Sequence, residues 1–222
     1  MAIVVFINGL LLLGLGVLMA FDALIFPATR VIFLEAALIT LSIGGGVCVS
    51  AMGRGPGLDR RHSFLLTGSA WFVAALAGGL PLWFWGLSFS DAFFESMSGI
   101  TTTGSTVMTG LDNTDQGILL WRALLQWIGG VGFIVAGIAL LPIMRVGGMQ
   151  LYQTESSEKG EKALASAARF ASATVWIYLA LTFICAIAYL SGGMTGFEAL
   201  VHAFTTVSSG GYSTSDSSFG LF

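Results

Sequence analysis

The stretch DAFFESMSGITTTGST, residues 91–106, returns later in the chain as EALVHAFTTVSSGGYS, residues 198–213. Each copy begins with an acidic residue and ends in a segment rich in glycine, serine and threonine. Gly104 and Gly211 each lie 13 residues after the acidic residue that opens their copy. This common spacing indicates an internal repeat, which is typical of membrane transport proteins.

Each copy contains a predicted helix that is too short to cross a bilayer. The helical segments 90–100 and 197–207 would be about 16 Å long at ~1.5 Å per residue, whereas the hydrocarbon core is about 30 Å thick. Asp91 and Glu198 lie in the first turns, where the helix dipole favours negative charge. The opposite helix ends carry a partial negative charge that suits a cation. We therefore expect two re-entrant loops.

The remaining sequence is typical of an integral membrane protein. Of its 222 residues, 55% are hydrophobic and 9% are charged, against about 25% charged in a soluble domain. The net charge of −3 is too small to suggest a nucleic acid partner, and the lipid bilayer is the expected surrounding. Spans of about 20 apolar residues are predicted over residues 2–20, 31–52, 64–80, 118–144 and 169–191.

Two basic segments give the expected orientation. Residues 53–63 and 145–169 contain most of the nine Lys and Arg residues. Two predicted spans separate these segments, so both lie on one side, which the positive-inside rule makes cytoplasmic. The N-terminus is then cytoplasmic, and both re-entrant loops lie on the outer side.

The glycine- and hydroxyl-rich loops suit a filter built from backbone carbonyl groups. Rings of carbonyl oxygens replace the water shell of a potassium ion, and glycine permits backbone conformations that other residues avoid. Neither loop has an ionised side chain between its short helix and its glycine. A carbonyl filter needs none, so the two loops predict a cation pathway.

The loops resemble those of a known family. Residues 94–106 are similar to the first pore loop of Trk-type potassium transporters, the TrkH/KtrB/HKT superfamily, and residues 202–214 are similar to the second. Residues 121–132 resemble the helix after the first loop, and residues 146–152 resemble its cytoplasmic end. The resemblance covers the whole chain, most weakly over the first two spans, and fits the TrkH branch best.

The resemblance implies an all-α integral membrane fold. Four helix–pore-loop–helix units surround a pseudo-fourfold axis, with two extra helices before them. It also implies potassium as the bound ion, no organic cofactor, a homodimer, and a cytoplasmic ring of nucleotide-binding regulatory subunits. Carried over residue by residue, the filter comprises Thr102, Thr103, Gly104 and Ser105 in the first loop and Ser209, Gly210, Gly211 and Tyr212 in the second.

On this pattern the chain divides into four parts. Residues 1–62 form two N-terminal transmembrane helices, 63–145 the first repeat, 146–168 a cytoplasmic loop, and 169–222 a second repeat without its closing helix. Because the family has four units, we expect a truncated Trk-type subunit of the bacterial inner membrane that acts in potassium uptake. The alternative is a non-conducting membrane fragment that acts in assembly or regulation.

An enzymatic function is not expected. The two histidines, His62 and His202, lie in different predicted compartments, and the sequence contains neither an HExxH nor a GxSxG motif. Cys48 and Cys185 lie in apolar runs without a CxxC spacing, so we expect both to behave as buried apolar residues.

Five polar residues in the predicted membrane segments have competing interpretations. Glu35 and Arg122 lie near the outer ends of their spans, where the side chains can reach the interface, so a structural role is favoured over a functional one. Gln126 is expected to bond a neighbouring helix rather than an ion. Glu95 and His202 hold matching repeat positions, and a packed role behind the filter is favoured over ion binding.

Three other groups of residues have expected roles. Asp112 and Asp115 follow the first loop and either attract cations to the pore mouth or simply solvate the loop. Residues 155–162 either solvate the cytoplasmic loop or, as the family suggests, dock a regulatory subunit. Close helix packing is expected at Gly129, Gly130, Gly132 and Gly137.

The orientation can be tested with single cysteines introduced at Asp112 and Lys159. An impermeant thiol reagent added outside intact cells is expected to label the first cysteine and not the second, because the bilayer separates them. The wild-type chain controls for labelling of the native cysteines. Reversed labelling would overturn the predicted orientation.

Overall fold

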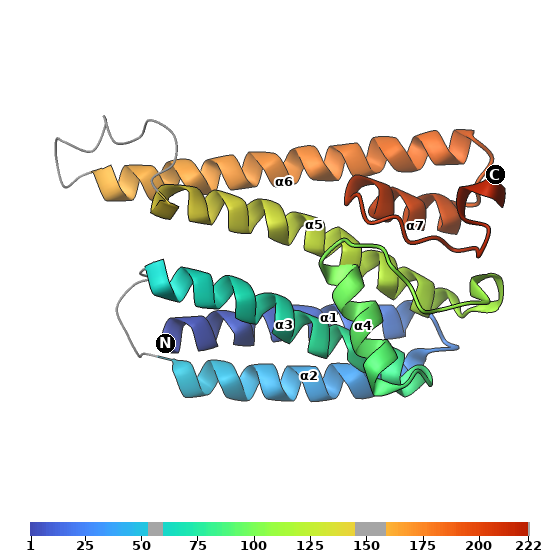
Figure 1. Ribbon diagram of the computed structural model, residues 1–222, viewed down its shortest axis with the longest axis horizontal. Helices are drawn as coiled ribbons and strands as arrows, with labels where there is room; N and C mark the ends of the chain where they lie inside the picture. Colours follow the sequence, from blue (N-terminus) through green and yellow to red (C-terminus); the bar gives the residue numbers. More distant parts are fainter. Residues whose placement is uncertain (53–59, 145–158, 222) are drawn as a thin grey trace.

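The computed structural model describes residues 1–52, 60–144 and 159–221, and within these ranges the chain consists of helices and loops (Figure 1). Each of five long helices contains a stretch long and apolar enough to cross a membrane, which confirms the predicted spans and the all-α fold class. These helices are α1 (Ala2–Ile25), α2 (Arg30–Ala51), α3 (Arg60–Trp85), α5 (Gln116–Met144) and α6 (Lys159–Ser191).

Two spans are longer than the sequence predicts. Helix α1 was expected to end at residue 20 and α3 at residue 80, but they continue to Ile25 and Trp85. Asp22 interrupts the apolar run of α1, yet it is 1% exposed and packs beside Gly117 at the start of α5. In α3 the helix runs through Pro81, which removes only one backbone hydrogen bond.

Two half-length helices lie at the same end of the molecule (Figure 1). Helices α4 (Phe89–Ile100) and α7 (Gly196–Val207) have 12 residues each, as the repeat predicts. The Ser88 hydroxyl accepts a hydrogen bond from the Asp91 N–H at 3.1 Å, and Thr195 forms a capping box with Glu198. Side-chain caps of this kind define where a helix begins. Short 3₁₀ helices follow at Leu111–Asn113 and Ser218–Leu221.

Small residues bring α1 and α2 close together. A methyl group added at Gly44 would lie 3.0 Å from the Leu13 nitrogen and 3.1 Å from the Gly9 carbonyl oxygen. Helices in lipid gain no hydrophobic energy from associating, so close backbone packing through small residues is a main source of their affinity. Gly44 therefore fixes the distance between the two N-terminal helices.

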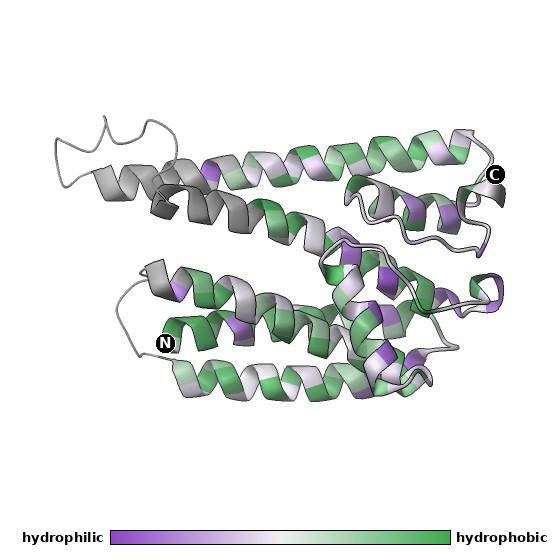
Figure 2. Cartoon of the chain, viewed as in Figure 1, coloured by the Kyte–Doolittle hydropathy of each residue, from purple (hydrophilic) through white to green (hydrophobic). Residues whose placement is uncertain are grey.

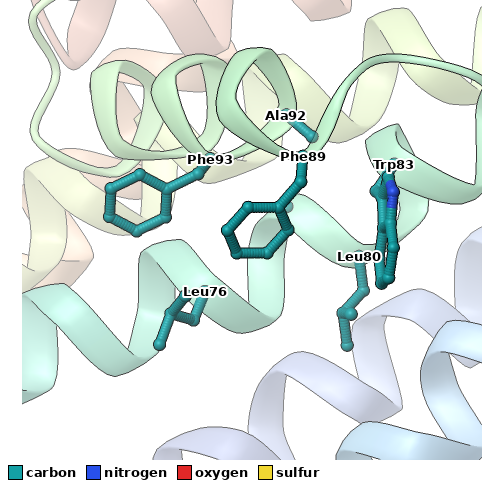
Figure 3. Close-up of a pocket in the computed structure, with 7 residues that line it drawn as sticks. Leu76, Leu80, Trp83, Phe89, Ala92 and Phe93 are labelled. Atoms are coloured by element: carbon teal, nitrogen blue, oxygen red, sulfur yellow. The ribbon is translucent and has the colours of Figure 1, made fainter.

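Helix α4 rests on α3 through apolar side chains (Figure 3). Gly79 allows this contact, because a methyl group there would lie 3.1 Å from the carbonyl oxygen of Ala92. Around this point a small apolar pocket is lined by Leu76, Leu80, Trp83, Phe89 and Phe93. The contact anchors the first half-helix against a spanning helix.

Hydrophilic residues lie on α4, α7 and the first turns of α5, whereas the long helices are mostly hydrophobic (Figure 2). The outward side chains of α6 include Trp176, Phe183 and Ile184, all more than 60% exposed, as expected of a helix in contact with lipid or further protein. Cys48 is buried as predicted, but Cys185 is only partly buried. Most of the predicted cytoplasmic loop lies outside the described residues.

Replacing Gly44 with leucine should destabilise the N-terminal helix pair by about 1–3 kcal/mol, because overpacking forces backbones apart. The matched control is Gly46→Leu, since nothing lies within 4 Å of a methyl group at that position. Thermal unfolding in detergent should show a lower midpoint for the first variant only. Equal midpoints for the two variants would contradict the packing role.

Candidate functional site

The loops after α4 and α7 follow the same backbone course. Thr102 and Gly104 have left-handed φ angles of 56° and 80°, and Ser209 and Gly211 have φ angles of 60° and 82°. The residue between each pair is not left-handed. Such an alternation allows successive carbonyl groups to face one side of a loop. A left-handed conformation costs a non-glycine residue about 1–2 kcal/mol, so the surroundings must hold Thr102 and Ser209 in place.

The two loops also have the same pattern of backbone hydrogen bonds. The Ser98 carbonyl accepts from the N–H groups of Thr103 and Gly104 at 2.9 and 3.4 Å. The Thr205 carbonyl accepts at 2.8 and 3.2 Å from the equivalent two groups of the second loop. The loop N–H groups therefore satisfy the last carbonyl groups of each half-helix, and the carbonyl groups of the loops are left for other partners.

Three consecutive carbonyl groups in each loop accept no hydrogen bond from any residue that the structure describes. Ser105 differs, because its carbonyl oxygen accepts from the Ser98 hydroxyl at 2.6 Å and from the Tyr212 hydroxyl at 3.3 Å. Free oxygens in such a row can replace the water shell of a cation. Within the described residues, no donor bonds the carbonyl oxygens of Thr102, Thr103, Gly104, Ser209, Gly210 and Gly211.

The loops touch at two glycines. A methyl group at Gly104 would overlap the carbonyl oxygen of Gly210, so the backbones meet with no room for a side chain. Gly211 has open space around it, so only its left-handed φ favours glycine there. Gly104 is therefore required both by its conformation and by its contact.

A buried ion pair lies behind the first loop. Glu95 is fully buried and Arg122 is 1% exposed. The Arg122 Nε and Nη2 atoms donate to Glu95 Oε1 at 2.8 and 2.6 Å, and the Thr106 hydroxyl donates to the same oxygen at 2.7 Å. The expectation that Arg122 reaches the interface is wrong, because Glu95 holds it inside.

Tyr212 connects this ion pair to the second loop. Its ring lies 4.2 Å from the Arg122 guanidinium carbon, and its hydroxyl donates to the Glu95 carbonyl oxygen at 2.8 Å. A desolvated cation–π contact is worth up to about 2 kcal/mol. The side chain of a predicted filter residue therefore serves as an anchor between the two repeats.

His202 takes the place of Glu95 in the second repeat. It is fully buried, and its Nε2 lies 3.1 Å from the Ser213 hydroxyl, which matches the bond between Glu95 and Thr106. Its Nδ1 lies 2.8 Å from the Glu198 carbonyl oxygen, which can only accept, so Nδ1 donates there, and in the neutral ring Nε2 then accepts from Ser213. The favoured prediction of a packed, hydrogen-bonded role behind the loops is confirmed for Glu95 and His202.

Other predictions have mixed outcomes. Gln126 was expected to bond a neighbouring helix, but its Oε1 accepts from the backbone N–H of Tyr212, a loop residue, at 3.2 Å. Gly129 and Gly130 do permit close packing, the first against the Ile100 carbonyl and the second against Tyr178 and Ser208. Glu35 is exposed. The surroundings of Gly137 and residues 155–158 lie outside what the structure describes.

Asp216 links the chain segments that follow the two loops. The sequence did not predict this role. The Asp216 carboxylate accepts from the N–H groups of Gly110 and Leu111 at 2.8 and 3.1 Å. A hydrogen bond from the Ser215 side chain, helped by the Asp216 N–H, holds the pKa of Asp112 below its usual range. Asp112 is therefore ionised at neutral pH. The sequence signal that could have identified Asp216 is the acidic residue that follows each loop, Asp112 after the first and Asp216 after the second.

Asp115 also has a structural partner, because the Trp85 indole N–H donates to its carboxylate at 3.0 Å. Both acidic residues nevertheless remain exposed at this end of the molecule. Among the described residues, no group of three or more His, Cys, Asp or Glu side chains could hold a metal ion. Carbonyl and hydroxyl oxygens are therefore the cation ligands that the loops offer.

Comparison with known proteins places this arrangement in a family. The sequence profile of the family described as "TrkH: Cation transport protein" matches residues 30–222. The chain belongs to the TrkH family. The "Trk system potassium uptake protein TrkI" of Halomonas elongata is 40% identical over 203 residues, which cover 90% of this chain and 40% of that protein. The "Trk system potassium uptake protein TrkH" of Escherichia coli is 41% identical over 199 residues, covering 86% of this chain and 40% of that protein.

The fold agrees with a solved member of the TrkH family. The crystal structure of the potassium transporter TrkH from Vibrio parahaemolyticus has a TM-score of 0.86 and 37% sequence identity. The match covers 99% of this chain and 45% of that chain. The chain thus spans less than half the length of these TrkH-family relatives.

Removing Arg122 should destabilise the protein strongly. Arg122→Leu leaves the Glu95 carboxylate buried and unpaired, which costs about 3–5 kcal/mol. The double variant Glu95→Gln/Arg122→Leu should recover part of this loss, because no charge is stranded. Thermal unfolding in detergent measures both, with Arg30→Leu at an exposed position as the control. A double variant no more stable than Arg122→Leu would contradict this account.

Proposed function

We propose that the chain contributes to potassium uptake by binding dehydrated potassium ions on its two loops. The observation that carries this proposal is the row of free carbonyl oxygens, which recurs in both loops with the same alternating φ angles. Carbonyl oxygens replace the water shell of potassium in selective filters. The names of the relatives, which are potassium uptake proteins, support the same ion.

The residues of the two loops take different roles in this proposal. Ser105 and Tyr212 hold the loops, because the carbonyl oxygen of Ser105 and the side chain of Tyr212 already make bonds within the scaffold. The negative ends of α4 and α7 point toward the loops and favour a cation there. The proposed ion ligands are the carbonyl oxygens of Thr102, Thr103, Gly104, Ser209, Gly210 and Gly211.

A complete filter requires more protein than these two loops. Thr101, Thr103 and Ser209 are exposed, and irregular backbone is not tolerated against lipid. We propose that further loops, from additional repeats or a second copy, cover this side. We also propose placement in the bacterial inner membrane, homodimers and cytoplasmic nucleotide-binding subunits, all of which rest on the family resemblance. The proposed cytoplasmic N-terminus rests on the positive-inside rule.

The second candidate is a non-conducting subunit that acts in assembly or regulation. The exposed apolar side chains of α6 offer a surface for further protein. A flux measurement separates this candidate from the first.

The proposal is tested by rubidium uptake in cells stripped of their own potassium-uptake systems. Cells that express the chain are expected to take up rubidium, and Gly104→Asp should abolish uptake, because the side chain would collide with the Gly210 carbonyl. Gly104→Ser adds a Cβ at the same contact, so the loops must shift. It should lower uptake and also reduce the preference for rubidium over sodium about tenfold, which equals ~1.4 kcal/mol of differential binding.

Two outcomes would count against the proposal. Unchanged ion preference in Gly104→Ser would sink the filter assignment. No uptake, with the wild-type chain present in the membrane, would favour the non-conducting candidate.

A further inference from the structure

The side-chain amide of Gln126 lies at the junction of the two loops. Gln126 belongs to α5 and is fully buried. A methyl group at Gly210 would overlap this amide, and one at Gly104 would lie 3.6 Å from its Nε2 atom. The amide is therefore in contact with one loop and adjacent to the other.

The two ends of the amide face different partners. Its Oε1 accepts from the Tyr212 N–H at 3.2 Å, which fixes the orientation of the group. Its Nε2 is buried and has no hydrogen-bond partner among the described residues. Buried polar groups are nearly always bonded, and an exception calls for an explanation. Gln126 thus satisfies the buried Tyr212 N–H at one end, while its other end is unbonded beside Gly104.

We infer that Gln126 is a positioning residue that fixes the separation of the two loops and thereby their discrimination between potassium and sodium. This inference rests on the proposed function. Functional groups must be held to within about 0.5 Å of their working geometry by side chains that are themselves locked. Gln126 meets this condition, because Tyr212 locks one end of its amide while the other end faces Gly104. Space filling alone would not require the amide.

The test is amide hydrogen exchange of the purified chain in lipid nanodiscs, in potassium chloride and in sodium chloride. In wild type, potassium should slow the exchange of residues 101–107 and 208–214 more than sodium does. Gln126→Leu should speed exchange in both segments about tenfold and abolish the difference between the ions, while α1 to α3 stay protected. The matched control is Gln116→Leu, an exposed glutamine at the start of the same helix, which should behave as wild type.

The outcomes separate the inference from the proposed function. Among the described residues, Gln126 has no hydrogen bond to residues 101–107, so any change of exchange there reports on the separation of the two loops. Unchanged exchange of residues 101–107 in Gln126→Leu would therefore overturn the inference. If the wild-type exchange rates are the same in potassium chloride and in sodium chloride, both the proposed filter and its discrimination between the ions are contradicted. If Gln126→Leu loses protection in every helix, Gln126→Asn decides: it keeps the amide but is one methylene too short. Loss of protection confined to the two segments supports the inference, and wild-type protection overturns it.

Discussion

The contact between the Gly104 backbone and the Gly210 carbonyl is the constraint on which the rest of the site depends. It brings together two irregular segments, whose backbone polar groups are not satisfied by regular secondary structure. The half-helices satisfy only part of this need, through the Ser98 and Thr205 carbonyls. Helix α5 supports both loops as well.

Helix α5 serves both repeats because of its residue spacing. Arg122, Gln126 and Gly129 follow one another at intervals of four and three residues, so they share one face. Arg122 bonds the first half-helix, Gln126 bonds the second loop, and Gly129 lets α5 approach the end of α4. The neighbouring Trp121 donates to the Gly78 carbonyl at 2.8 Å and ties α5 to α3. A shift of α5 would therefore disturb both loops at once.

The sequence predicts the parts of this structure that depend on local signals. Apolar length predicts the five spans, and acidic first turns with a common spacing predict the half-helices. The repeat also predicts which residues of the two loops are equivalent. The partners of Arg122, Gln126 and Tyr212 could not be predicted, because each contact joins segments that are distant in the sequence. Arg122 was placed at the interface because its distance from the helix end was the only information available.

The two repeats reach one arrangement with different charges. Glu95 is negative but shares its hydrogen bonds with Arg122, so the pair has no net charge. His202 makes the equivalent hydroxyl contact through a ring nitrogen, and in its neutral form the ring carries no charge. With a neutral His202, the side chains behind the loops would add little net field. In the proposed filter, the carbonyl groups and the ends of α4 and α7 would then supply the attraction for a cation.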